Sequence, residues 1–404
     1  MRVNVGVDLH KTQFTVCVKG LGEDQFAVYP TTKEGYEAFL KRVANWRECG
    51  MEVKAAVEST GNTRHFKNRL EEAGIGVTVI NTLRFKVVNE SVKKTDKHDA
   101  GTIAEFQEKD MLPQSHLCSQ KSEQMRRLLK ARTTLVHAQV VMKNQIHALL
   151  TAEGFEDVKG SLQSKRGRKR TLDTLKQCKN GLAAQTLMEI IDQLEGNVNL
   201  VEKELRELTK EDKAVELLMS IPGCGEVCAW TIRAYTDDIR RFACAKKYAS
   251  YAGLAPWVQN SNETVHHGKI TKRGPEQLRT ALVQVVMGMR RMKEKTLRWR
   301  LMERHEIMKR NKGSGKSIIA TARKVAVIIW NMLTKEAIFE EERMTDGKLL
   351  KTSESMKKSV RTLEKIPVKE VTRNMDKTKL AVNCIEKKVI KKTGVARKRN
   401  EKAG

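Results

Sequence analysis

The chain has 404 residues, of which 77 are Lys or Arg and 49 are Asp or Glu, so its formal net charge is +28. This length allows two or three domains with cores of their own. A positive excess of this size favours a polyanionic partner, and phosphate backbones are the commonest kind. The sequence has no run of eighteen apolar residues and no apolar leader, so we expect a cytoplasmic protein without a membrane partner.

The first hundred residues alternate between strand and helix patterns. Residues 3–9 alternate apolar and polar side chains, which is the period-two signature of a strand, and Asp8 stands near its carboxyl end. Three strands in a row, followed by alternating helices and strands, match the RNase H-like plan of a mixed sheet covered on both sides. The later predicted elements are strands at 14–18, 26–29, 53–58 and 77–80, and helices ending near Trp46, at 63–73, and around Ala100.

Four carboxylates in this region predict a site for divalent metal. Asp8 and Glu58 end two predicted strands, where ligands of α/β sheets usually sit. Asp96 and Asp99 are three residues apart, so they share one face if a helix starts at Thr95. Each could instead serve as a cap or a surface charge. Their order along a strongly basic chain favours joint binding of two metal ions, which can stabilise both oxygens of a phosphodiester displacement.

Actin-like kinases and ATPases share this fold and also open with a strand ending in Asp. They follow it with a Gly-rich phosphate turn, whereas residues 9–12 here are Leu-His-Lys-Thr. The missing glycine argues against a nucleotide clamp.

Residues 111–212 are predicted to form a helical arm. Apolar residues recur at helical spacing over 122–150, and a heptad runs from Ile191 to Leu208. The two helices are expected to form either an antiparallel hairpin in one chain or a dimer seam. Between them we predict a basic loop that is either solvated or a phosphate contact, the latter being favoured. Its cations are Lys165, Arg166, Arg168, Lys169 and Arg170.

A third region, residues 213–340, is predicted to be mostly helical. Its Ile-Pro-Gly-Cys-Gly turn, with Gly223 and Gly225, is typical of a helix-hairpin-helix, whose backbone N–H groups can hold phosphate. Ser261 is predicted to lie in a polar loop, where neighbouring cations could stabilise developing negative charge. From these residues alone, an ordinary loop serine is the simpler interpretation. The flanking cations are Lys269, Lys272, Arg273 and Arg279.

The remaining patterns in the sequence do not indicate a functional site. Residues 312–317 (Lys-Gly-Ser-Gly-Lys-Ser) lack the first glycine of a phosphate loop, so we interpret them as the turn before a core helix. The eight cysteines are scattered, and the close pair Cys224 and Cys228 lacks the spacing of a zinc site. Residues 341–404 are rich in Lys and Glu and predict a loosely ordered basic tail.

Taken together, these motifs resemble the DEDD transposases of bacterial insertion sequences, a family related to the Piv-type DNA invertases. The resemblance spans roughly residues 3 to 335. It rests on Val-Gly-Val-Asp ending at Asp8, Glu-Ser-Thr-Gly from Glu58, residues 94–100, Ile-Pro-Gly at 221–223, Gly-Leu-Ala-Pro at 253–256, Ser261, and residues 268–274.

The resemblance implies a RuvC-like domain at residues 1–110 with Asp8, Glu58, Asp96 and Asp99 binding Mg²⁺, or alternatively Mn²⁺. It also implies a C-terminal transposase domain with Ser261 as the nucleophile. The implied partners are donor and target DNA, a structured guide RNA from the element, and further copies of the chain in a dimer or tetramer. A bacterial member would associate with the nucleoid when acting.

Two rival functions stay open at this point. A RuvC-type junction resolvase would cut with water and would not need Ser261. A non-catalytic nucleic-acid-binding protein would bind DNA independently of metal and of Asp8.

Overall fold

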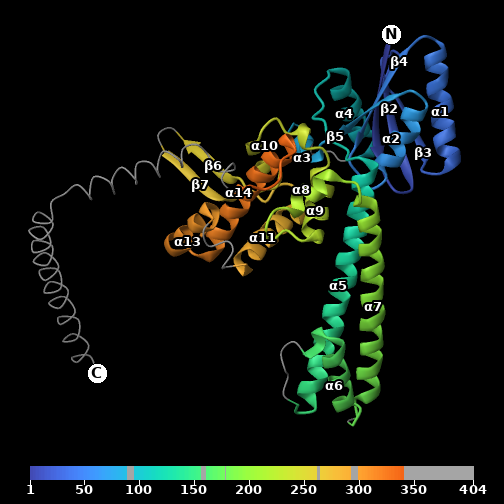
Figure 1. The fold of residues 1–404 in the computed structure, drawn as a ribbon. Coiled ribbons are helices and arrows are strands. Elements are labelled where there is room, and N and C mark those ends of the chain that lie inside the picture. Colours follow the sequence, from blue (N-terminus) through green and yellow to red (C-terminus); the bar gives the residue numbers. More distant parts are fainter. Residues whose placement is uncertain (89–94, 156–160, 178, 262–263, 293–298, 341–404) are drawn as a thin grey trace, which may run out of the picture. The chain divides into compact units, whose positions relative to one another are not determined.

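The computed structural model describes residues 1–88, 95–155, 161–177, 179–261, 264–292 and 299–340 (Figure 1). Its contacts divide the chain into two compact units, Met1–Glu123 (unit 1) and Gln124–Gly404 (unit 2), which we describe separately. The predicted basic tail at 341–404 lies outside the described residues. The expected division into four regions stays a prediction.

Unit 1 is a mixed five-stranded sheet with helices on both faces. The strand order is β3-β2-β1-β4-β5; β1, β2 and β3 are antiparallel, whereas β1, β4 and β5 are parallel. The elements are β1 (Arg2–Leu9), β2 (Gln13–Lys19), β3 (Gln25–Pro30), α1 (Lys33–Glu48), β4 (Glu52–Glu58), α2 (Thr63–Glu72), β5 (Gly76–Ile80), α3 (Thr82–Val88) and α4 (Asp96–Glu108).

Side chains alternate between the two faces of the sheet along β1, so odd-numbered and even-numbered residues contact different helices. Val3, Val5 and Val7 join the core formed with α1 and α2. Gly6 lies on the opposite face, where a Cβ atom would come within 2.2 Å of the Ala100 carbonyl oxygen. Because this glycine has no side chain, the α4 backbone packs directly on the strand. The even-numbered residues of β1 therefore face α4.

The predicted strands of unit 1 are all present, and threonines cap two of its helices. Thr32 is the N-cap of α1, and its side chain accepts a hydrogen bond from the Gly35 N–H. Thr95 caps α4 in the same way, accepting from the His98 N–H. The short helix α3 was not predicted. Its segment, Thr-Leu-Arg-Phe-Lys-Val-Val, is β-branched and apolar enough to be ambiguous between strand and helix.

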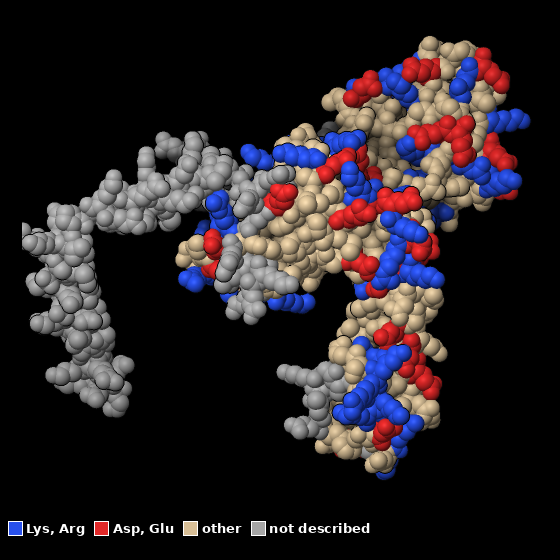
Figure 2. All heavy atoms as spheres, in the orientation of Figure 1, with Lys and Arg blue, Asp and Glu red and all other residues tan. Residues whose placement is uncertain are grey.

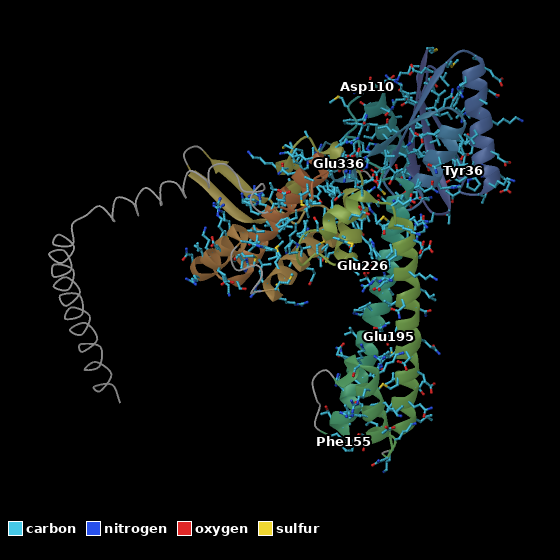
Figure 3. All side chains as sticks on the ribbon, viewed as in Figure 1. Tyr36, Asp110, Phe155, Glu195, Glu226 and Glu336 are labelled. Carbon is cyan, nitrogen blue, oxygen red and sulfur yellow. The ribbon has the colours of Figure 1, made fainter. Side chains whose placement is uncertain are left out.

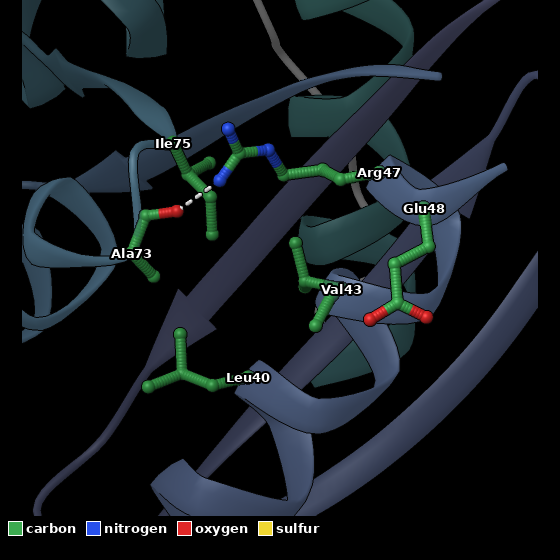
Figure 4. Close-up of a pocket in the computed structure, with 7 residues that line it drawn as sticks. Leu40, Val43, Arg47, Glu48, Ala73 and Ile75 are labelled. Carbon is green, nitrogen blue, oxygen red and sulfur yellow. Dashed lines mark hydrogen bonds between the residues drawn. The ribbon is translucent and has the colours of Figure 1, made fainter. Parts of the chain in front are cut away.

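A surface cleft of about 370 Å³ lies between α1 and the turn that follows α2 (Figure 4). Its lining is mostly apolar, and the Arg47 guanidinium donates a hydrogen bond to the Ala73 carbonyl across it. None of the predicted site residues lines this cleft, so the candidate chemistry lies elsewhere.

Unit 2 is mostly helical, with one two-stranded sheet in its described part. α5, which begins in unit 1, and α7 form the arm, and α8 to α14 surround a second core that includes Trp230, Leu282 and Ile329. The elements are α5 (Gln120–Ala152), the 3-10 helix η1 (Ser161–Gln163), α6 (Lys165–Leu175), α7 (Gly181–Thr209), α8 (Lys213–Met219), α9 (Glu226–Thr236), the 3-10 helix η2 (Ile239–Arg241), α10 (Ala245–Tyr251), β6 (Pro256–Ser261), β7 (Thr264–Ile270), α11 (Glu276–Arg291), α13 (Arg300–Lys312) and α14 (Ser314–Lys335).

The arm is an antiparallel helix hairpin within one chain. Figure 1 shows α5 and α7 side by side, and the Arg132 guanidinium on α5 pairs with the Glu202 carboxylate on α7 at 2.7 Å. Farther along, Ile146 and Ile191 belong to one buried cluster. Of the two arrangements expected for these helices, the structure shows the hairpin.

One described helix, α14, is long and apolar enough to cross a membrane, and core helices of soluble domains often meet the same criteria. Ala322, Val325 and Ile329 of α14 are buried in the unit 2 core. The turn predicted over residues 312–317 is confined to Gly313, which has a φ of 84° between α13 and α14, and residues 314–317 already belong to α14.

Candidate active site in unit 1

The strand register brings the two predicted strand-end carboxylates to one edge of the sheet. Val7 pairs with Val57 in the parallel β1–β4 ladder, so Asp8 and Glu58 follow as neighbours. Both continue the face that carries Gly6 and Ala56, and this face is covered by α4. The Thr63 hydroxyl donates to the Glu58 carbonyl at 2.7 Å and fixes the end of β4.

The N-terminus of α4 brings the other two carboxylates to the same edge. Asp96 and Asp99 lie in its first turn, where the helix dipole favours negative charge. An Asp96 carboxylate oxygen, an Asp8 carboxylate oxygen and a ring nitrogen of His10 all lie within 4.8 Å of one another. In the described part of the chain, the Glu58 and Asp99 carboxylates are not members of this group of three.

The electrostatics of Asp8 reflect this crowding. Partial burial raises the pKa of its carboxyl above the usual value, and the nearby charges of Asp96 and Asp99 raise it further, whereas His10 opposes the shift. A carboxyl surrounded in this way gains from a bound cation. The group therefore has both the oxygen ligands and the uncompensated charge that a divalent metal ion requires.

His10 was not among the predicted site residues. Its Nε2 lies 3.1 Å from an Asp8 carboxylate oxygen and 3.6 Å from an Asp96 carboxylate oxygen. A signal was present in the sequence, because a histidine two residues beyond a strand-end aspartate can turn back toward it when a tight hairpin follows.

Ser261 lies at the end of a strand, not in the predicted polar loop. Residues 256–261 and 264–270 pair as the antiparallel hairpin β6–β7, in which Ser261 is opposite Thr264. The pattern Thr-Val-His-His-Gly-Lys-Ile contains β-branched residues that favour such a strand. Ser261 therefore adjoins the hairpin turn, and residues 262–263 lie outside the described part.

The register separates Ser261 from the cations predicted to flank it. Ser261 is at the tip of the hairpin, whereas Lys269 lies near the base of β7, and Lys272 and Arg273 lie in the turn beyond it. The Lys272 N–H donates to the Gly253 carbonyl at 3.2 Å, and Lys272 itself adopts a φ of 52°. Lys269, Lys272 and Arg273 are exposed. Arg279 differs from them, because its guanidinium donates to the Lys272 carbonyl and so supports the turn.

The predicted glycine turn joins α8 and α9, but its two glycines differ. Gly223 has a φ of 83°, and a Cβ atom there would come within 2.4 Å of the Met289 backbone nitrogen. This glycine is thus required for packing against α11. Gly225 is exposed before α9, and a Cβ atom there would meet nothing within 4 Å. Phosphate binding by this turn stays a prediction.

The predicted basic loop is a helix. Residues 165–175 form α6, with Ser164 as its N-cap. Arg168 is buried and pairs with Asp192 and Glu195 of α7, so its charge is taken up inside the arm (Glu195 is labelled in Figure 3). The other four predicted cations are exposed, and Figure 2 shows Lys and Arg gathered over α6. They are Lys165, Arg166, Lys169 and Arg170.

Comparison with known proteins identifies the family. One family model, a DEDD transposase model, matches residues 5–153, and a second, described as the transposase IS116/IS110/IS902 family, matches residues 215–300. The chain belongs to the IS110 family of transposases. It is therefore an enzyme that acts on DNA in transposition, by cleavage and strand transfer, and the DEDD family generally uses divalent metal ions.

Curated relatives agree over most of the chain. It is 28% identical over 352 residues to the transposase for insertion sequence element IS1111A of Coxiella burnetii, covering 83% of this chain and 90% of that protein. It is 24% identical over 339 residues to the transposase for insertion sequence element IS1328 of Yersinia enterocolitica, covering 80% and 97% respectively. The two family models include the carboxylate segment, within residues 5–153, and Ser261, within residues 215–300.

Proposed function

We propose that this transposase cuts and rejoins DNA through a covalent link to Ser261, with Mg²⁺ held by Asp8, Glu58, Asp96 and Asp99. The observation that carries the metal site is the meeting of β1, β4 and the first turn of α4 at one edge of the sheet. Asp8 and Asp96 already have ligand atoms within 4.8 Å of each other. The strand order and the placement of the carboxylates support an RNase H-like, RuvC-like domain.

The divalent ions would supply a Lewis acid and neutralise charge on the phosphate oxygens. In the covalent step, the Ser261 oxygen forms a bond to phosphorus while the bond from phosphorus to a deoxyribose oxygen breaks. The serine proton passes to water, and the released deoxyribose oxygen is protonated. Positive charge beside the phosphate would offset the added negative charge. Lys269, Lys272 and Arg273 are exposed at the base of the hairpin, whereas Ser261 is at its tip. Attack by another deoxyribose hydroxyl then reforms a phosphodiester and releases the serine.

The partners follow from charge and family. Donor and target DNA are substrates of a transposase, and the exposed cations of α6 are proposed to contact a phosphate backbone. A structured guide RNA and assembly into a dimer or tetramer are proposed from the resemblance alone. The basic surface of α6 is compatible with either nucleic acid.

A covalent-trapping assay tests this function. The protein is incubated with element ends, RNA transcribed from the flanking segment, and Mg²⁺, then denatured and examined for a DNA–protein adduct. We expect an adduct in the unmodified protein and in the control Ser250→Ala, which removes an exposed serine of α10. Both Ser261→Ala and Asp8→Ala should abolish it.

The outcomes separate the rival functions. DNA cleavage that survives Ser261→Ala but requires Asp8 would mean hydrolysis by water, as in a junction resolvase. DNA binding that is indifferent to Mg²⁺ and to Asp8→Ala, with no cleavage, would mean a non-catalytic protein. Omitting the RNA tests guidance separately, because a guided enzyme loses site choice without it.

A further inference from the structure

His10 touches two carboxylates that come from different elements. Its Nε2 lies 3.1 Å from Asp8 at the end of β1 and 3.6 Å from Asp96 at the start of α4. The side chain is half exposed, so it is not held there by burial in a core. A ring nitrogen between two like charges is placed where a cation would also be most stable.

The backbone around His10 is fixed on two sides. The His10 N–H donates to the Gln13 carbonyl at 2.9 Å, which closes the turn between β1 and β2. The Asn62 side chain, at the N-terminus of α2, donates to the His10 carbonyl at 3.0 Å. These bonds orient the residue before any ligand arrives, as a binding site requires.

The distances suit a shared coordination shell. Ligand bonds of about 2.1 Å to an octahedral ion place neighbouring ligand atoms about 3 Å apart and opposite ones about 4.2 Å apart. The separations from Nε2 to the two carboxylate oxygens, 3.1 and 3.6 Å, are close to the first value. All three ligand atoms lie within 4.8 Å of one another, so a single ion could contact all of them.

We propose that His10 is a direct nitrogen ligand of the metal ion held by Asp8 and Asp96, a role that rests on the proposed metal site. Imidazole binds first-row transition ions well, whereas Mg²⁺ prefers oxygen ligands and keeps much of its water. The mixed nitrogen and oxygen set should therefore bind Mn²⁺ or Co²⁺ more tightly than Mg²⁺, and Mg²⁺ would occupy the site where it is the more abundant ion. The simpler alternative is that His10 only donates a hydrogen bond to Asp8.

Metal binding to the full chain, measured without DNA, distinguishes these roles. Mn²⁺ and Mg²⁺ affinities are obtained by calorimetry, and pulsed electron paramagnetic resonance of bound Mn²⁺ detects coordinated ¹⁴N. The variants are His10→Ala and Asp8→Asn, with His137→Ala, which removes an exposed histidine of α5, as the matched control. Labelling the unmodified protein with ¹⁵N-histidine repeats the nitrogen test without any substitution.

We expect a nitrogen signal that changes with the ¹⁵N label, disappears in His10→Ala and persists in His137→Ala. The Mn²⁺ dissociation constant should rise roughly tenfold to a hundredfold in His10→Ala, the scale seen when a metal ligand loses its support. The Mg²⁺ constant should change much less. Mn²⁺ binding that needs Asp8 but shows no nitrogen signal would overturn the ligand role and leave the metal site intact. Mn²⁺ binding unaffected by Asp8→Asn would overturn the metal site itself.

Discussion

Gly6 is the residue whose missing side chain allows α4 to reach the sheet. Because a Cβ atom there would meet backbone atoms of Ala100 and Ala104, no side-chain rotation can relieve the clash. We predict that Gly6→Ala destabilises the protein by about 1–3 kcal/mol or more. It should also weaken metal binding, because Asp96 and Asp99 move with α4. Chemical denaturation and metal calorimetry check both effects.

The matched control for this substitution is Gly76→Ala in β5. A Cβ atom at Gly76 meets nothing within 4 Å, so the change adds a methyl group without a clash. Equal destabilisation by the two substitutions would mean that general strand effects, and not the approach of α4, explain the result.

The Asp8 carboxylate is expected to lower the stability of the folded protein while providing a ligand for the metal ion. Its folded-state pKa is raised above the unfolded value of 3.8, so the folded protein holds the Asp8 proton more tightly and loses stability as pH rises through that range. At neutral pH the charged carboxylate therefore opposes folding. We predict that Asp8→Asn melts at a higher temperature than the unmodified protein in EDTA. Added divalent metal should raise the melting temperature of the unmodified protein only.

Asp110→Asn provides the opposite case. Asp110 is exposed, and its hydrogen bond to Arg2 lowers the pKa of its carboxyl (Figure 3 labels Asp110). Its removal should not raise the melting temperature in EDTA. A lower melting temperature for Asp8→Asn in EDTA would contradict the inference that the Asp8 carboxylate opposes folding when no metal is bound.

Among single residues, Asp8 and Asp96 could be predicted because strand alternation and a helix-capping threonine are local signals. His10 has a local signal, since a tight hairpin follows Asp8, but its orientation depends on the bond from Asn62, which lies 52 residues away in the chain. Arg168 was misjudged for a related reason. In the sequence Arg168 stands among other cations, which is typical of a solvated surface, and its acidic partners on α7 become apparent only in the folded structure.

At the scale of elements, α6 has one buried cation with a structural role, Arg168, and four exposed cations that are proposed to bind nucleic acid. Removing Arg168 leaves Asp192 and Glu195 without their buried partner, so we predict that Arg168→Ala lowers stability by about 1.5–3 kcal/mol, the range for hydrogen bonds to charged groups. Replacing Arg170, which is exposed on the same helix, should leave stability nearly unchanged. Denaturant titration of the two variants measures the difference.

The outer cations of α6 should act on nucleic-acid affinity instead. Replacing Lys165, Arg166, Lys169 and Arg170 by Gln removes up to four phosphate contacts. The slope of log affinity against log salt should then fall by up to about 0.9 for each contact with duplex DNA. Filter binding or fluorescence anisotropy across a salt series gives the slope. An unchanged slope would show that α6 does not meet the phosphate backbone.

The joint between α13 and α14 contains a buried histidine that should sense acid. His305 is almost fully buried, and its Nδ1 lies 3.0 Å from both the Ser317 and Thr321 hydroxyls. Burial lowers its pKa below the usual 6.5, with Glu306 opposing the shift and Arg290 and Lys309 adding to it. The unfolded chain therefore takes up the His305 proton at a higher pH than the folded chain does.

It follows that stability should fall as pH drops below about 6.5 and continue to fall until the folded histidine is protonated. Melting temperatures measured from pH 7.5 to 5 should show this slope in the unmodified protein and in His137→Ala. His305→Asn should melt lower throughout but with a flatter dependence. Identical slopes in all three proteins would assign the acid sensitivity to other groups.

Elements with clear periodicity were predictable, and those defined by distant contacts were not. The strands of unit 1 follow alternation that is visible in the sequence. The sequence of α6 does not show a helical apolar face, because Arg168, rather than an apolar residue, forms part of its inner face together with Thr171 and Leu175. The β6–β7 hairpin was missed because its segments are polar, and their pairing is visible only once the register is known.

At the scale of the whole molecule, the proposed metal ligands belong to unit 1, whereas the proposed nucleophile and the exposed cations of α6 belong to unit 2. Figure 2 shows both signs mixed over unit 1, where the carboxylates gather. The exposed cations of α6 and of the turn after β7 both belong to unit 2. Composition alone predicted a polyanionic partner. It could not show which surfaces carry the excess of positive charge, because paired cations such as Arg168 count equally in a net charge.

The position of the candidate metal site along the chain has a consequence for synthesis. All four carboxylates and His10 precede residue 100, within a unit that has its own buried core, whereas Ser261 comes much later. A ribosome that stops between α4 and β6 would release a fragment that contains the proposed metal ligands but lacks the serine of the proposed link to DNA. Incomplete translation would then leave the genome uncut by this route.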